Sequence, residues 1–189
     1  MLYREALIDV DEVLGDFQTP AMKAIEEVTG IQIDLSTLNH WDIFSVVPTE
    51  EENAKVWAKI AEPGFATKIE PTPGAKEFIQ ELRKMAHVGI CTSPCYKSPT
   101  WVYERTQWLW DHFGIHEDDI HYTNAKYKVQ GDLLLDDRPH HIAKWSKRHP
   151  HGTGLLWHIP NTANLPFTGT RVHTWDQVLD HADKKFSAT

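Results

Sequence analysis

Three short apolar runs in this sequence each end in side chains that carry oxygen atoms, and a lysine precedes the last run. These side chains are Asp9 and Asp11 after the first run, Thr92 and Ser93 after the second, and Asp136 and Asp137 after the third, with Lys126 before it. If the runs are parallel strands, their carboxyl ends meet at one edge of a sheet, where open α/β sheets bind ligands. Carboxylate oxygens gathered there suit Mg²⁺, which binds a few carboxylates together with a substrate phosphate.

A phosphoryl group held at such a site needs a nucleophile, compensation of its negative charge and a general acid for the leaving oxygen. Asp9 can be the nucleophile and form an aspartyl-phosphate, while Asp11 can protonate the leaving oxygen and later activate water. Lys126 and a bound Mg²⁺ would offset the negative charge, and Thr92 and Ser93 can donate hydrogen bonds to phosphate oxygens. These residue types predict a magnesium-dependent phosphomonoesterase.

The elements that must position these groups alternate between strand and helix along the chain. The patterns predict strands over residues 5–10, 88–91, 121–123, 132–136 and 154–157, and helices over 16 to about 38 (with Gly30 as a stop), 49–61, 75–85, 99–113 and 174–185. This alternation indicates an α/β fold with a parallel sheet that helices cover on both faces.

One stretch of the chain, residues 37–69, is less regular and rich in large aromatic side chains. Its one clear helix opens with Thr49 followed three residues later by Glu52, which fits a capping box. We interpret residues 16–70 as a small, mainly helical cap inserted after the first strand, and residues 1–15 and 71–189 as the core domain.

The composition limits the partners and the location of the protein. The 189 residues fit one domain with an inserted subdomain, and the net charge of −8 is poorly suited to gripping a nucleic-acid backbone. A small anionic substrate is still compatible with this charge if a bound cation inverts the local field. Two cysteines, no leader-like N-terminus and no apolar run of about 20 residues favour a cytoplasmic protein with reduced thiols and no membrane contact.

Longer segments around the strand ends carry a family resemblance. Asp9-Val-Asp11, Thr92, Lys126 and Asp136-Asp137 stand in the order of the four motifs of the haloacid dehalogenase (HAD) superfamily of phosphatases. The chain also resembles the 5'(3')-deoxyribonucleotidase family in the segments Asp9-Val-Asp-Glu-Val-Leu-Gly-Asp-Phe17, Ile90-Cys-Thr-Ser-Pro94, Tyr122-Thr-Asn-Ala-Lys126 and Asp132-Leu-Leu-Leu-Asp-Asp-Arg-Pro139. The resemblance implies a Rossmann-like HAD fold and hydrolysis of nucleoside 5'- or 3'-monophosphates.

The resemblance also implies roles for individual residues. Asp9 would be the nucleophile and a Mg²⁺ ligand, Asp11 the acid–base that also binds the metal through its carbonyl, and Asp137 the third ligand, with Asp136 behind it. Phosphate would be bound by Thr92, Ser93 and Lys126, and the nucleobase would stack on cap aromatics, for which the candidates are Trp57, Trp41, Phe44 and Phe65. A departure from the family is Glu12, which stands where the family usually has glycine.

Several plainer interpretations stay open beside these. Thr92, Ser93 and Pro94 could simply cap a helix, Lys128 could replace Lys126, and the cap aromatics could be subdomain core. The twelve histidines follow no ligand spacing, and we expect His140, His141, His149 and His151 to be exposed loop residues. The substrate could instead be a sugar phosphate, a modified nucleotide or a polynucleotide 3'-phosphate. A binding protein without turnover is the alternative from another class, and a homodimer is neither favoured nor excluded.

Overall fold

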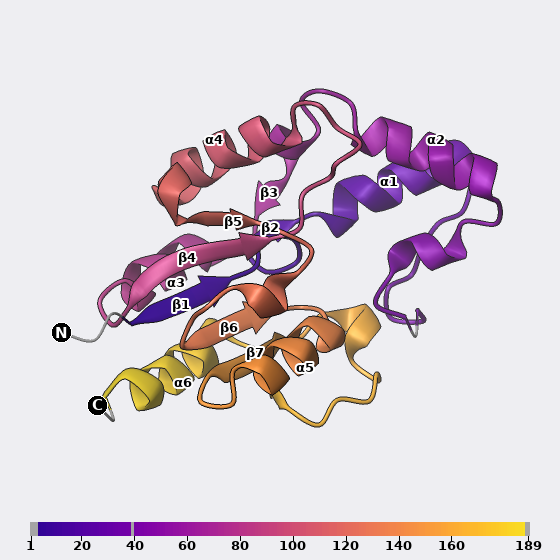
Figure 1. Ribbon diagram of the computed structural model, residues 1–189. Coiled ribbons are helices and arrows are strands. Elements are labelled where there is room, and N and C mark those ends of the chain that lie inside the picture. Colours follow the sequence, from indigo (N-terminus) through magenta and orange to yellow (C-terminus); the bar gives the residue numbers. More distant parts are fainter. Residues whose placement is uncertain (1–3, 39, 188–189) are drawn as a thin grey trace.

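Six parallel strands form the central sheet of the computed structural model, which describes residues 4–38 and 40–187 (Figure 1). Their order is β5-β4-β1-β6-β7-β8, with bounds Ile120–Tyr122, His87–Thr92, Glu5–Ile8, Leu133–Asp136, Thr153–Trp157 and Thr170–Val172. In the register, Ile8 of β1 lies opposite Ile90 of β4 and Leu135 of β6. From β1 the chain first extends the sheet on one side, with β4 and β5, and then on the other side, with β6, β7 and β8. Open α/β sheets bind ligands at the point where the strand order reverses in this way.

Helices cover both faces of this sheet, as the sequence predicts. Successive residues of a strand point to opposite faces, so Ala6 and Ile8 enter one apolar layer and Leu7 the other. The larger layer includes α3 (Ala75–Leu82), α4 (Trp101–Phe113) and α6 (Trp175–Ser187), whereas α5 (Pro139–Arg148) covers Leu7. Figure 1 shows α3 behind the sheet and α5 in front of it.

Most of the segment of residues 15–71, which follows β1, lies beyond the carboxyl ends of the strands (Figure 1). It contains α1 (Gln18–Thr29), which packs against α2 (Glu50–Ile60), and the short 3₁₀ helices η1 (Ile43–Val46) and η2 (Ala66–Lys68). Its two ends are joined because β2 (Gly15–Asp16) pairs antiparallel with β3 (Glu70–Pro71). No helix in the described ranges is long and apolar enough to cross a membrane.

The predicted helix boundaries hold for α2 and α4 but not for α1. The Thr49 hydroxyl accepts a hydrogen bond from the Glu52 amide at 3.1 Å, which confirms the predicted cap of α2. The prediction that a helix continues to about residue 38 is wrong. At Gly30 the backbone adopts φ 74°, and the Gly30 amide donates to the Glu26 carbonyl, so the left-handed residue closes the helix. Helix α5 and strand β8 were not predicted.

Candidate active site

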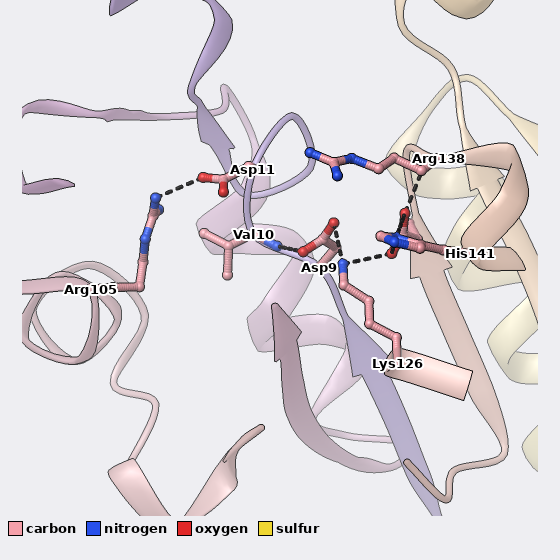
Figure 2. Close-up of polar contacts among 8 residues, drawn as sticks. Asp9, Val10, Asp11, Arg105, Lys126, Arg138 and His141 are labelled. Carbon is pink, nitrogen blue, oxygen red and sulfur yellow. Dashed lines mark hydrogen bonds and ion pairs between the residues drawn. The ribbon is translucent and has the colours of Figure 1, made fainter. Parts of the chain in front are cut away.

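A buried cluster of charged groups occupies the carboxyl ends of β1 and β6 (Figure 2). The ammonium of Lys126, at the start of η4 (Lys126–Lys128), lies 2.6 Å from Asp9 Oδ2 and 2.7 Å from Asp136 Oδ2. The other Asp9 oxygen accepts a 2.7 Å hydrogen bond from the Val10 amide, and His141 Nδ1 of α5 lies 3.0 Å from Asp136 Oδ2. A single lysine therefore bridges the carboxylates of two neighbouring strands.

The electrostatics of this cluster favour the charged forms of Lys126 and Asp136, whereas burial raises the pKa of Asp9, an effect that the charge of Lys126 opposes. Burial by itself would lower the pKa of Lys126, but the charges of Asp136 and Asp9 hold this pKa above its ordinary value. Burial likewise opposes ionisation of Asp136, yet Lys126 and then His141 bring the pKa of this carboxyl below its ordinary range. Lys128, the alternative considered from the sequence, lies instead with its ammonium 5.9 Å from the centre of the Tyr127 ring.

Two buried polar atoms near the cluster have no hydrogen-bond partner among the described residues: Thr92 Oγ1 at the end of β4 and Asp137 Oδ1 after β6. Burial and the neighbouring charge of Asp136 raise the pKa of Asp137 well above its ordinary value. An unpartnered buried polar atom costs about 1–3 kcal/mol, so native proteins rarely retain one without a use. Asp137 Oδ1 is therefore suited to bind a cation, and the Thr92 hydroxyl is suited to donate a hydrogen bond to an acceptor on a ligand.

Asp11 is turned away from Asp9 and is paired with an arginine that sequence reasoning missed (Figure 2). Arg105 of α4 is fully buried, and its guanidinium lies 2.7 Å from Asp11 Oδ1. The guanidinium carbon is also 5.0 Å from the Trp101 ring centre and 5.2 Å from that of Trp108. The available signal was the helical spacing that puts Arg105 on the same buried face as these two tryptophans.

Beside Asp11 opens a cavity of about 420 Å³ whose walls include several aromatic rings. Its lining includes Asp11, Ser93, Lys97, Asn124, Arg138, Phe17, Trp41, Phe44, Trp57 and Trp101. Phe44 and Trp57 are stacked with ring centres 4.5 Å apart. Three of the four predicted cap aromatics thus line the cavity, whereas the fourth, Phe65, packs against Trp101 and Phe17.

Glu12 occupies a turn that suits glycine. It has φ 64° and is the non-glycine residue with positive φ in the described part of the chain. Holding a side chain in this left-handed conformation costs on the order of 1 kcal/mol. The carboxylate compensates by accepting a 2.6 Å hydrogen bond from the Gln18 amide at the start of α1.

Two plainer interpretations of the sequence are contradicted. No helix starts at Thr92-Ser93-Pro94 in the described structure, because α4 begins only at Trp101, so these residues are not a helix cap. The expectation of exposed loop histidines is wrong for His140, which lies on α5, for His141, which is buried on α5 against Asp136, and for His149, which is buried with Nε2 3.0 Å from the Tyr127 carbonyl oxygen. Pro139 at the first helical position was the overlooked signal for α5.

The parallel sheet has the Rossmann-like fold of the HAD hydrolases, as similar solved structures show. The structure matches a haloacid dehalogenase-like hydrolase from Streptococcus pneumoniae with a TM-score of 0.65 and 12% identity, over 95% of this chain and 98% of that chain. It also matches a HAD-type chain from Bacillus subtilis, solved bound to magnesium, with a TM-score of 0.58 and 17% identity, over 97% and 100% of the two chains. At these identities the likeness establishes the fold.

Within this class the chain belongs to the family described as 5' nucleotidase, deoxy (pyrimidine), cytosolic type C, which matches residues 5–185. The human cytosolic-type 5'(3')-deoxyribonucleotidase is 30% identical over an alignment 189 positions long, which covers 92% of each chain. The resemblance recognised in the sequence is therefore confirmed. The chain is a phosphoric monoester hydrolase of a nucleotide phosphatase family.

Proposed function

We propose that this enzyme dephosphorylates (deoxy)ribonucleoside 5'- or 3'-monophosphates in a Mg²⁺-dependent reaction through an aspartyl-phosphate on Asp9. The observation that carries the proposal is the buried bridge from Lys126 to Asp9 and Asp136, next to an aromatic cavity of about 420 Å³. The bridge orients a carboxylate at a strand end, as a nucleophile requires, and the charge of Lys126 opposes the rise in the pKa of Asp9 that burial causes. The cavity provides apolar walls for the part of the substrate that is not phosphate.

In the first step an oxygen of Asp9 attacks phosphorus, and the bond from phosphorus to the nucleoside oxygen breaks. Asp11 delivers a proton to that departing oxygen. In the second step Asp11 takes a proton from a water molecule, whose oxygen attacks the same phosphorus and releases inorganic phosphate from Asp9. Because Asp11 faces Arg105 in the structure, this role requires its side chain to turn toward the leaving oxygen.

Asp9, Asp137 and the backbone carbonyl of Asp11 would hold Mg²⁺, which supplies positive charge to the phosphoryl oxygens. The unpartnered Asp137 oxygen fits this assignment, since a buried carboxylate with a raised pKa lacks a cation. A second set of candidate ligands is Asp9, Asp136 and His141, whose ligand atoms lie within 4.8 Å of one another. We prefer Asp137, because Lys126 already lies between Asp9 and Asp136 and His141 is paired with Asp136.

Phosphate would be held by Lys126 and by the hydroxyls of Thr92 and Ser93. Thr92 Oγ1 is buried without a partner, and Ser93 lines the cavity, which supports both assignments. Trp57, Trp41 and Phe44 would form the wall on which the nucleobase stacks. We also propose that residues 16–70 act as a cap, since β2 and β3 join the two ends of this segment beside the site.

The human relative is named as a cytosolic type, and we propose a cytoplasmic location here too.

A different small phosphate ester, such as a sugar phosphate, is the second candidate substrate. The net charge of −8 disfavours a polynucleotide 3'-phosphate. Membership of a phosphatase family disfavours a binding protein without turnover.

A phosphate-release screen tests the proposal. The enzyme with Mg²⁺ is assayed on 5'- and 3'-monophosphates of ribo- and deoxyribonucleosides and on sugar phosphates. We expect release from nucleotides that EDTA stops, that Mg²⁺ restores and that Asp9→Asn abolishes. Near-normal turnover by Asp9→Asn would refute the covalent mechanism, and activity confined to sugar phosphates would refute the nucleotidase assignment.

A further inference from the structure

Asn161 is a buried amide whose hydrogen-bonding groups are engaged on both sides. It lies in η5 (Pro160–Thr162), after β7, and is 1% exposed. Its Oδ1 accepts a 3.1 Å hydrogen bond from Gln18 Nε2. Its Nδ2 donates to the backbone carbonyls of His40 at 3.0 Å and Trp41 at 3.1 Å. Since a buried polar group left unpaired costs about 1–3 kcal/mol, these bonds fasten three distant chain segments together.

One end of this connection reaches the turn that follows the nucleophile. The backbone amide of Gln18 donates to Glu12 Oε1 at 2.6 Å, while the Gln18 side chain binds Asn161. Gln18 is itself buried and opens α1. We call Glu12, Gln18 and Asn161 the clasp. It links the loop that carries Asp9 and Asp11 to the C-terminal half of the sheet.

The other end of the clasp sets the position of an aromatic wall. Trp41 lines the large cavity, and its ring lies 5.3 Å from the ring of His140. The guanidinium carbon of Arg138 lies 4.8 Å from the centre of the Trp41 ring and lines the same cavity. Trp41 and Arg138 therefore form one side of the space beside Asp11. Asn161 holds the backbone from which the Trp41 ring projects.

We propose that Asn161 is a positioning residue for substrate selectivity, which fixes the Trp41–Arg138 wall by holding the backbone of residues 40 and 41. The inference rests on the proposed function for the identity of the substrate, a phosphate ester that carries a nucleobase. Asn161 contacts Gln18, His40 and Trp41 and not the bridge between Asp9 and Lys126. Its removal should therefore weaken binding of the nucleoside and leave phosphoryl transfer unaltered.

The test is the variant Asn161→Asp, which keeps the size and the acceptor for Gln18 but replaces the donor facing the two carbonyls with an oxygen. We expect KM for nucleoside monophosphates to rise about tenfold, because the two hydrogen bonds that hold the backbone of residues 40 and 41 are lost. The turnover number for nucleotides should change less than about twofold, and so should the activity on glycerol phosphate, which has no base. Asn164→Asp is the matched control. Asn164 is exposed and lies three residues after Asn161, and its substitution introduces the same charge.

Two further measurements separate positioning from a general loss of fold. In the Trp41→Ala background, Asn161→Asp should add almost nothing to KM, whereas additive effects would overturn the inference. Amide hydrogen exchange over residues 40–47 should be faster in Asn161→Asp than in Asn164→Asp. Equal losses on nucleotides and glycerol phosphate, or unchanged exchange, would also overturn it. If the wild type released phosphate from glycerol phosphate but from no nucleotide, the proposed function would fail, and the exchange comparison alone would decide whether Asn161 holds the wall.

Discussion

The guanidinium of Arg105 lies 2.7 Å from the carboxylate of Asp11 and turns this side chain away from Asp9 (Figure 2). The arginine is fully buried, and the Asp11 side chain is 19% exposed. Between turnovers the proposed acid–base is thus held by a cation from α4, a helix that lies between the motifs that end β4 and β6 and belongs to neither. Arg105 links the stability of the core to the position of the proposed acid–base.

Removing the Arg105 charge should destabilise the fold. In Arg105→Met the side-chain volume is largely kept, but Asp11 loses its cation, and breaking a buried pair in this way costs about 3 kcal/mol or more. We expect a decrease of about 2–4 kcal/mol in the free energy of unfolding, measured by urea denaturation, because Asp11 is partly exposed and water screens part of the loss. Arg148→Met, at an exposed position of α5, should change stability by less than about 0.5 kcal/mol. Equal stability of Arg105→Met and the wild type would contradict this view.

Glu12 should make stability depend on pH. Burial, and then the charge of Asp137, hold the pKa of Glu12 well above its ordinary value. A group whose pKa is higher in the folded state binds more protons there, so its contribution is complete below about pH 4 and is lost as pH rises through the folded pKa.

Glu12→Gln keeps an oxygen that can accept from the Gln18 amide but cannot ionise. We therefore expect Glu12→Gln and the wild type to be equally stable near pH 4 and the variant to be more stable at pH 8. The difference at pH 8 should be about 1.4 kcal/mol for each unit by which folding raises the pKa of Glu12. Urea denaturation in EDTA at several pH values measures this. Glu62→Gln, at an exposed position, should show no such trend, and a pH-independent difference for Glu12→Gln would contradict the prediction.

The two cysteines should differ in reactivity. Cys91 lies within β4 with no exposed surface, and burial raises the pKa of its thiol to about 12. Cys95 is partly exposed and lines the large cavity. Because the thiolate is the reactive form, iodoacetamide at pH 8 should modify Cys95 and spare Cys91 in the folded protein, as peptide mass spectrometry can show. Modification of Cys91 should require urea; its modification at an equal rate in the native protein would show that β4 opens.

Trp57 should contribute to binding of the base-bearing part of the substrate. It lines the cavity and stacks on Phe44, and stacking of a base on an aromatic ring contributes about 1–3 kcal/mol. We expect Trp57→Ala to raise KM for nucleoside monophosphates by about tenfold or more, with a smaller change in the turnover number. Trp110→Ala is the control, since Trp110 is a 54% exposed tryptophan on α4. An unchanged KM in Trp57→Ala would mean that this ring packs in the core of the cap and does not contact the substrate.

The strand ends were predictable from local pattern alone. Short apolar runs that end in Asp9, Thr92 and Asp136 read as buried parallel strands, and parallel strands bring their carboxyl ends to one edge. The sequence also predicted that Lys126 lies with them, and its ammonium does bridge Asp9 and Asp136. The end of α1 was misjudged although Gly30 carried the signal, because apolar residues continue beyond it.

By itself the sequence determined the parallel sheet, the acidic groups at its edge and the family, because these depend on periodicity and on motifs only a few residues long. The tertiary structure alone decided what holds those groups. Arg105 meets Asp11 across 94 residues of chain, and Asn161 meets Gln18 across 143. Such contacts depend on how α4 and the loop after β7 pack against the rest of the protein. No local pattern encodes that packing, so the partners of Asp11 and Trp41 appeared only once the chain was folded.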